Sequence, residues 1–175
     1  MGLLKTAILF EELDSDKKRH SISVATVAKR LAVSAKLSDR FAYMCGLFHD
    51  IGYVIDKNEH NLAGYNLLKE ERLDELAIIS LLHSFGPDFS EKVEMEANKI
   101  TIAEDLKDYI ELVTVADFIV NSKGEICGTS KRYKDIINRH GEESIQGKVA
   151  KKQLTYAKSW LNKYGIETIG ACIIS

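Results

Sequence analysis

Apolar residues recur at intervals of three and four along almost the whole chain, and no stretch alternates apolar and polar residues as a half-buried strand does. Val24, Val27 and Leu31 form one such series, and Leu106 and Ile110 begin another. Side chains at these intervals lie on one face of an α-helix. The pattern therefore predicts an all-α fold, a compact bundle of seven to eight helices.

Capping residues, glycines and the single proline bound the expected helices. Ser38 and Asp74 are suited to begin helices as N-caps, whereas Gly86-Pro87 and Gly165 are suited to follow helix ends. Helices are expected over residues 3–13, 59–69, 97–121, 129–139 and 143–164, with three more that contain His20, follow Ser38 and follow Asp74. A polar loop is expected before residue 97. The apolar tail over residues 166–174 is expected to pack back onto the bundle or to contact a partner.

Length and charge limit the function classes. The chain has 175 residues with 24 basic and 26 acidic side chains, for a formal net charge of −2. A chain of this length buries about 70% of the surface of its unfolded form and normally makes one domain. Because no repeat or linker interrupts the helical pattern, residues 1–175 are expected to form a single domain. The balanced charge argues against a general nucleic-acid binder, so long nucleic acids are not expected as partners.

Cysteine usage and hydropathy indicate the compartment. Cys45, Cys127 and Cys172 include no Cys-x-x-Cys pair, which fits neither a disulfide framework nor a thiolate metal site. Residues 2–10 are apolar, but their only cation lies inside the run and Glu11 follows, so they do not resemble a signal peptide. No apolar run reaches the ~18 residues of a membrane span. A cytoplasmic protein without a membrane partner is expected.

Four polar residues occupy positions where the helical periodicity calls for an apolar side chain. They are His20, His49, His83 and Asp117. Burying such a group without a partner is costly, most of all for a carboxylate. A hydrogen bond to a backbone carbonyl would explain any one of them, but it explains four on separate helices poorly. Imidazole and carboxylate bind Zn, Fe, Mn and Ni, and a bundle core can collect ligands from several helices, so the pattern predicts a metal site.

Asp50 joins this group because it directly follows His49. Neighbouring residues of a regular helix point about 100° apart, so they share an ion only near a helix end. Ile51 and Gly52 follow and allow the chain to leave helical geometry there. His49 and Asp50 are therefore expected to lie at the end of their helix.

Three segments share the order of a known motif: residues 19–25 (RHSISVA), 45–52 (CGLFHDIG) and 115–119 (VADFI). They resemble the H…HD…D signature of the HD-domain superfamily of metal-dependent phosphohydrolases. The resemblance runs from about residue 18 to about residue 141. At the matching positions, it implies metal ligands at His20, His49, Asp50 and Asp117.

Residues 59–64 (EHNLAG) and 81–84 (LLHS) resemble the binuclear branch of that superfamily, which adds two histidines. The resemblance implies further ligands at His60 and His83 on a second ion, with Asp50 as the bridging carboxylate. With a single ion, His60 and His83 would instead line the pocket and bind phosphate. Asn61 stands where that branch often has Pro, and the chain lacks the GYP motif of the HD-GYP cyclic-dinucleotide phosphodiesterases.

Basic residues near these motifs are candidates for substrate binding. The run Lys17, Lys18 and Arg19 directly precedes the first histidine and could steer an anion, with Lys18 and Arg19 as the candidates, although such a run usually lies on a solvated face. Arg132 lies in a segment that resembles the tail of small uncharacterised HD hydrolases, and it could clamp phosphate or pair with Asp135. His140 is interpreted as structural, at a helix end where positive charge is favourable.

These features predict a metal-dependent phosphohydrolase that acts on a small phosphoester or nucleotide by attack of metal-bound hydroxide at phosphorus, with His49 and Asp50 at the catalytic centre. The expected cofactor is one or two divalent ions. Histidine and carboxylate ligands suit Fe, Mn, Ni, Co and Zn alike, so the sequence does not identify the metal. Two alternatives stay open: hydrolysis of a dinucleoside polyphosphate such as diadenosine tetraphosphate, and a non-catalytic module that binds metal and nucleotide. A homodimer is left open as well.

Overall fold

The computed structural model describes residues 2–88, 90–169 and 172–173. Within these residues the chain forms nine α-helices, two 3-10 helices and two short strands. In chain order they are α1 (Gly2–Phe10), α2 (Ser15–Ala35), α3 (Asp39–Phe48), η1 (Ile51–Val54), α4 (His60–Glu70), α5 (Asp74–Leu82), η2 (His83–Asp88), α6 (Glu91–Ala97), α7 (Glu104–Ile119), α8 (Thr129–His140), α9 (Ile145–Lys163), β1 (Thr168–Ile169) and β2 (Cys172–Ile173). The predicted all-α fold is confirmed, with one helix more than the upper estimate.

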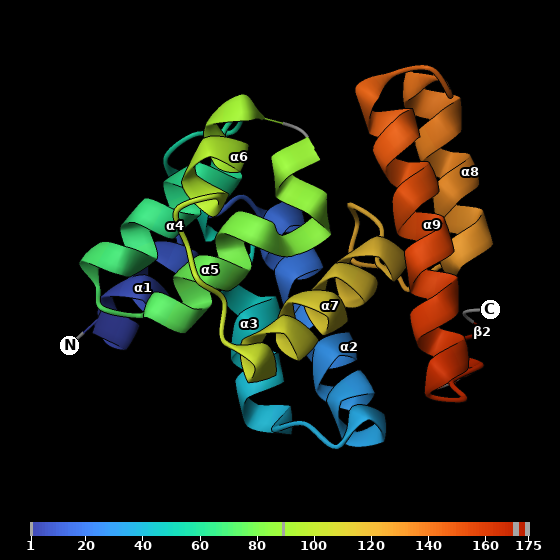
Figure 1. The fold of residues 1–175 in the computed structure, drawn as a ribbon, viewed down its shortest axis with the longest axis horizontal. Helices are drawn as coiled ribbons and strands as arrows, with labels where there is room; N and C mark the ends of the chain where they lie inside the picture. The colour runs from blue at the N-terminus through green and yellow to red at the C-terminus, as the bar shows by residue number, and fades with distance from the viewer. Residues whose placement is uncertain (1, 89, 170–171, 174–175) are drawn as a thin grey trace.

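Helices α2, α3 and α7 pack against one another and form the centre of the molecule. Helices α4 and α5 form a pair beside them, and α5 contacts both α3 and α7. The core between these helices is apolar, and Leu31, Leu68 and Leu112 are among its completely buried side chains. Helices α8 and α9 form a hairpin on one side of this group, where α9 contacts α7 and η2 (Figure 1). The site described below lies between the central helices and this hairpin.

Side-chain caps define where several helices begin. The side chain of Asp14 accepts hydrogen bonds from the backbone N–H groups of Asp16 and Lys17, which starts α2 at Ser15. Ser38 caps α3 as predicted, by accepting from the N–H of Phe41 at 3.3 Å. Asp74 does not act as the predicted cap; it is the first residue of α5, and Leu73 precedes it without a side-chain bond.

The helix predicted over residues 97–121 is correct only from Glu104 to Ile119, because residues 98–103 form a non-helical connection after the separate helix α6. Helix α6 forms within the stretch predicted as a loop and buries Val93, and α7 begins only at Glu104. Between them Ile100 and Ile102 both pack against the core, whereas Lys99 and Thr101 are exposed. Alternate residues share a face in extended backbone, so two isoleucines two positions apart favour this conformation over a helix.

The C-terminal tail adds the two strands, which were not predicted. Strands β1 and β2 pair antiparallel, and Ile166 before them packs against the core as expected. The remainder of the tail, residues 170–171 and 174–175, lies outside the described residues, and its expected contact with a partner stays a prediction. Of the helices that the structure describes, none has the length and apolarity needed to cross a bilayer.

Gly52 allows η1 to pack directly on α4. A methyl group at this position would overlap the carbonyl oxygen of His60 and the backbone nitrogen of Gly64. We therefore expect Gly52→Ala to lower the free energy of unfolding by about 3 kcal/mol, since neither backbone atom can move without shifting α4. Gly165→Ala is the control: its methyl group would meet no atom, and the left-handed conformation costs only about 1 kcal/mol. Urea unfolding measures both, and equal losses would contradict the packing argument.

Candidate metal centre

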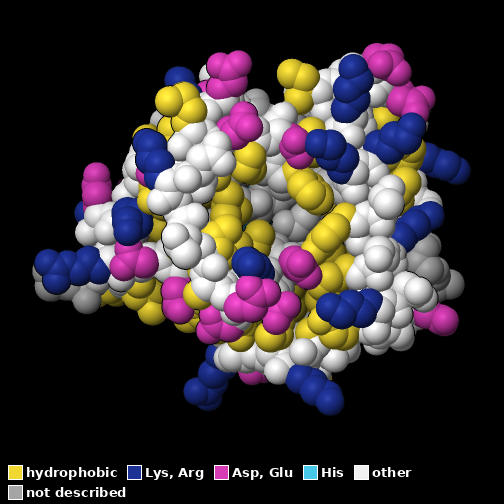
Figure 2. All heavy atoms as spheres, in the orientation of Figure 1, with side chains coloured by type: hydrophobic (Ala, Val, Ile, Leu, Met, Phe, Trp, Pro, Cys, Tyr) yellow, Lys and Arg dark blue, Asp and Glu magenta, His cyan; other side chains and the backbone are white. Residues whose placement is uncertain are grey.

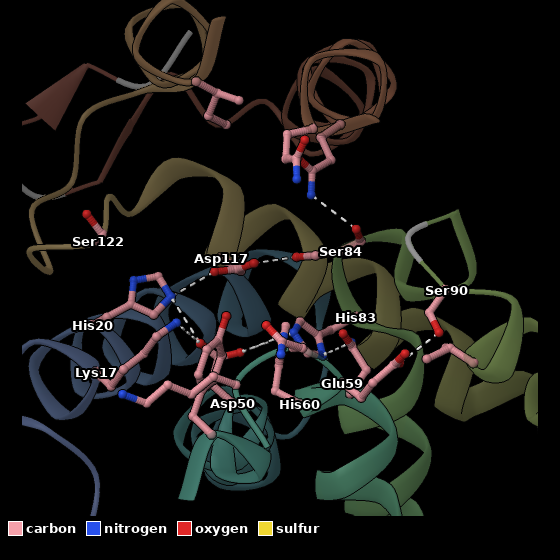
Figure 3. Close-up of a pocket in the computed structure, with 18 of the residues that line it drawn as sticks. Lys17, His20, Asp50, Glu59, His60, His83, Ser84, Ser90, Asp117 and Ser122 are labelled. Carbon is pink, nitrogen blue, oxygen red and sulfur yellow. Dashed lines mark hydrogen bonds and ion pairs between the residues drawn. The ribbon is translucent and has the colours of Figure 1, made fainter. Parts of the chain in front are cut away.

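Six histidine and aspartate side chains from five parts of the chain converge on one point, and Figure 3 labels five of them, all except His49. They are His20 on α2, His49 and Asp50 after α3, His60 at the start of α4, His83 at the start of η2 and Asp117 on α7. They form three overlapping groups, each with its ligand atoms within 4.8 Å of one another: His20, His49 and Asp50; His49, His83 and Asp117; Asp50, His60 and His83. The structure thus brings together all six residues that the sequence predicted as ligands.

Asp50 lies at the centre of this cluster, with its two carboxylate oxygens facing different histidines. Its Oδ1 lies 3.5 Å from Nε2 of His60 and 3.4 Å from Nε2 of His83. Its Oδ2 lies 3.6 Å from Nε2 of His49 and 4.0 Å from Nε2 of His20. A carboxylate placed in this way can serve two ligand groups at once.

Asp117 lies beside the two histidines that face Oδ2 of Asp50. Its Oδ1 lies 2.8 Å from Nε2 of His20 and 3.6 Å from Nε2 of His49. His20 and His49 thus lie beside Asp117 and Oδ2 of Asp50, and His60 and His83 lie beside Oδ1 of Asp50. His83 also shares a ligand group with His49 and Asp117, so the geometry alone does not divide the ligands between two ions as the resemblance to the binuclear branch implies.

The backbone after α3 explains how His49 and Asp50 both face the cluster. Helix α3 ends at Phe48, and His49 still has helical backbone angles as its C-cap. Asp50 has φ −101° and ψ 12°, which departs from the helix, and the 3-10 turn η1 follows. The expected position of this pair at a helix end is what the structure has.

Three of the histidines are oriented by backbone carbonyl groups. The Nδ1–H groups of His20, His49 and His83 donate to the carbonyl oxygens of Asn121, Gly46 and Ser80, at 2.9, 2.7 and 2.9 Å. A histidine that donates from Nδ1 directs Nε2 inward, with a lone pair available when the ring is neutral. The Nε2 atom of His49 is buried and has no hydrogen-bond partner. Such an atom in a set of imidazole and carboxylate donors fits a divalent metal ion.

The charges of the cluster perturb one another strongly. Burial alone would raise the pKa of Asp50, but the positive charges of His49 and Lys17 and a hydrogen bond from His83 hold it well below its usual range. The pKa of Asp117 is likewise held low against burial, mainly by the hydrogen bond from His20 and by the nearby positive charge of His49. Burial lowers the pKa of His60 to about 4, despite the opposing charge of Asp50. Both carboxylates are therefore ionised, as metal ligands must be.

Ser84 and Asn61 support the ligands and were not predicted from the sequence. The Ser84 hydroxyl donates to Oδ2 of Asp117, and its N–H donates to Thr114 Oγ1 at 3.0 Å. Ser84 has a φ of 54°, a left-handed conformation that is unusual without glycine. The Asn61 amide donates to the carbonyl oxygen of Ser80 at 3.1 Å and lies 3.3 Å from Nδ1 of His83. Asn61, which stands where the binuclear branch often has Pro, thus contacts the candidate ligand His83.

Lys17 contacts the cluster, whereas Lys18 and Arg19, the members of the same cationic run predicted to bind substrate, do not. Its Nζ lies 3.1 Å from Oδ2 of Asp50 and 3.4 Å from the centre of the Tyr53 ring. Lys18 instead contacts Glu11, and Arg19 is exposed beside Asp16. Successive helical residues point in different directions, so a run of three cations in the sequence could not show which one faces inward.

A cavity of about 440 Å³ opens onto the cluster. Lys17, Tyr53 and His60 line it on the side of the central helices, and Arg132 lines it on the side of α8 while pairing with Asp135 at 2.9 Å, so its predicted role in substrate binding stays a prediction. His140, interpreted as structural from the sequence, also lines it. Lys18 and Arg19 do not line this cavity.

Comparisons with known proteins agree with the geometry. The family model of the HD domain matches residues 18–121, which is more than half of the chain and includes all six candidate ligands. Ribonuclease Y of Mycoplasmoides gallisepticum (strain R(low / passage 15 / clone 2)) is 30% identical over 105 residues, or 57% of this chain. The matched part is 18% of the length of that relative. No solved structure matches the chain.

The lowered pKa of His60 leads to a prediction about stability and pH. Between pH 6.5 and about 4 the unfolded chain takes up a proton at this residue that the folded chain does not, so stability falls as the pH is lowered. His60→Asn should reduce the stability lost by chelator-treated protein between about pH 7 and about pH 4.5 by roughly 2–3 kcal/mol. Urea unfolding at both pH values measures this. His140→Asn, which removes an exposed histidine, is the control, and an unchanged pH dependence in His60→Asn would contradict the assignment.

Proposed function

Because the chain belongs to the HD domain family, whose members hold divalent metals, we propose that it is a metal-dependent phosphohydrolase acting on a small, nucleotide-like phosphoester. The observation that carries this proposal is the Asp50 carboxylate, whose two oxygens face separate histidine groups. In the two-ion form that we favour, His20, His49 and Asp117 would hold one ion, His60 and His83 the other, and Asp50 would bridge them. Fe, Mn, Ni, Co and Zn all suit these ligands.

A divalent ion at this position would supply Lewis acidity toward phosphoryl oxygens and lower the pKa of bound water toward about 7. The protein's own part is to hold the ligands rigidly and to bind the substrate beside them. Ser84 fixes one oxygen of Asp117, which leaves the other directed at His20 and His49. The carbonyl groups that accept from Nδ1 prevent three of the imidazole rings from turning.

Lys17 is the residue that we assign to the phosphoryl group undergoing hydrolysis. Burial opposes its charge, but Asp50 and Tyr53 raise the pKa of Lys17 well above its ordinary value, so the side chain stays protonated. Its side chain lines the cavity, and its ammonium group lies against the Tyr53 ring, which also stacks on His60 with ring centroids 4.1 Å apart. When an ion neutralises Asp50, this ammonium group is available to an anionic substrate at the same place.

A second candidate substrate class is the phosphodiester bond of RNA, which the similarity to Ribonuclease Y favours. Dinucleoside polyphosphates and a non-catalytic nucleotide-binding role are further alternatives. A panel of p-nitrophenyl phosphate, bis(p-nitrophenyl) phosphate, diadenosine tetraphosphate and a short labelled RNA separates them. Capture of nucleotide without product at any metal would support the non-catalytic alternative and contradict hydrolysis.

The central role of Asp50 predicts a graded loss of metal. Asp50→Asn should lose both ions and lower phosphoester hydrolysis by about a hundredfold or more, because it removes the carboxylate shared by the two groups. His83→Asn should lose only one of the two ions. Metal analysis of the purified variants, with activity measured in parallel, tests both statements. Asp105→Asn, an exposed carboxylate on α7, is the control, and full metal content and activity in Asp50→Asn would refute the proposed site.

Lys17 and Lys18 form a matched pair for the substrate assignment. Lys17→Gln should raise KM for a phosphoester by about tenfold, since it removes a charge-assisted hydrogen bond to the substrate. Lys18→Gln removes the same charge from the next residue, which contacts Glu11 outside the cavity, and should leave KM near the wild-type value. Steady-state kinetics measures both. The assignment is wrong if the two variants behave alike.

A further inference from the structure

Helix α8 presents a cationic face to the cavity. Four of its residues line the cavity: Arg132, Ile136, Arg139 and His140. Candidate metal ligands line the opposite side of the same cavity. The four positions on α8 are related by four, seven and eight residues, which places them on one side of a helix. Figure 2 shows the molecule hollowed between the central helices and the α8–α9 hairpin, with Lys and Arg side chains on the hairpin side.

Arg132 is largely buried in this wall and uses few of its donors. Its side chain is 15% exposed, and Nη1 donates to Oδ2 of Asp135 at 2.9 Å. The Nε atom is buried and has no hydrogen-bond partner. A guanidinium group has five N–H donors in a rigid fork, and leaving a buried donor unpaired costs free energy. The unpaired donor therefore indicates that Arg132 is built to bind a group that the protein itself does not supply.

Asp135 holds a second guanidinium group beside the first. Nη2 of Arg139 donates to the same Oδ2 atom, at 2.8 Å, so one carboxylate oxygen serves both arginines. One negative charge against two positive charges leaves the group cationic. Ion pairs at these spacings are common on solvated helices and contribute little to stability. Here, however, both arginines line the cavity that holds the metal centre, where a ligand can replace the solvent.

We propose that Arg132 and Arg139, with His140 beside them, bind a second phosphate of the substrate, distinct from the phosphoryl group at the metal centre. The proposal rests on the proposed function and names its substrate class: a nucleotide with at least one phosphate besides the scissile one. The guanidinium fork matches phosphate oxygens in a bidentate manner. Because both guanidinium groups bond to Oδ2 of Asp135, they lie close enough together to bind one phosphate, and Ile136 on the same face offers an apolar surface to the rest of the ligand.

Adenosine 5′-monophosphate and adenosine 3′,5′-bisphosphate are a matched pair of probes, since they differ only in one phosphate. Equilibrium dialysis of the chelator-treated full chain measures binding of both without hydrolysis. The wild-type protein should bind the bisphosphate about tenfold more tightly. Arg132→Gln should reduce this preference to near one, and Arg132→Lys, which keeps the charge and loses the fork, should reduce it partly. Lys134→Gln removes an exposed charge from the same helix outside the cavity and should retain the full preference.

Two results would overturn this inference: no preference in the wild-type chain, or the same preference in Arg132→Gln as in Lys134→Gln. Arg139 is more exposed, at 44%, so Arg139→Gln serves as a second variant if Arg132→Gln fails to fold by circular dichroism. Because dialysis needs no metal, its outcome is independent of the proposed hydrolysis. A wild-type preference that Arg132→Gln removes, in a chain that hydrolyses no phosphoester, would support the subsite and refute the proposed function. Hydrolysis of a phosphoester by a wild-type chain that binds both nucleotides equally would support the proposed function and refute the subsite.

Discussion

The burial of the Asp50 carboxylate is the constraint on which the rest of the structure depends. The residue is 4% exposed at the centre of the molecule, where an unpaired negative charge would be prohibitively costly. The fold resolves this by directing side chains from α2, α4 and η2 at it, together with its own neighbour His49. The packing of those elements therefore depends on the charge of this one carboxylate. The close approach of η1 to α4 at Gly52 is part of the same arrangement, because it brings His60 within reach.

The α8–α9 hairpin is connected to this centre through a short series of hydrogen bonds. The Gln153 amide on α9 donates to the carbonyl oxygen of Ser84 at 3.2 Å. The Ser84 hydroxyl donates in turn to Asp117, as Figure 3 shows. Ser84 and Phe85 both have left-handed backbone angles, which is costly for residues other than glycine. The strained turn is thus placed where it serves both a candidate ligand and the contact with the hairpin. The hairpin lies outside the matched family region, yet it completes the wall of the cavity.

The candidate ligands could be predicted from the sequence because a histidine or aspartate among the apolar residues of one helix face interrupts a regular pattern. His20, His83 and Asp117 stand out in this way, and their meeting needs only that their helices bury those faces. Lys17 could not be distinguished from Lys18, since the start of α2 depends on the Asp14 cap and one residue of shift turns a side chain by about 100°. Ser84 was hidden for another reason: left-handed angles at a serine result from tertiary contacts and leave no local signal. The same holds for the break between α6 and α7, where core contacts of Ile100 and Ile102 outweigh helix propensity.

His20 and Asp117, joined at 2.8 Å, are 97 residues apart in the sequence. An ion held between them would bind the folded chain alone, since the unfolded chain rarely brings these two segments together. Its binding free energy would then be part of the free energy of folding, with a contribution of about 2.7 kcal/mol at a free concentration one hundred times the dissociation constant. In a cell, the supply of metal would thereby set the lifetime of this protein as well as its activity.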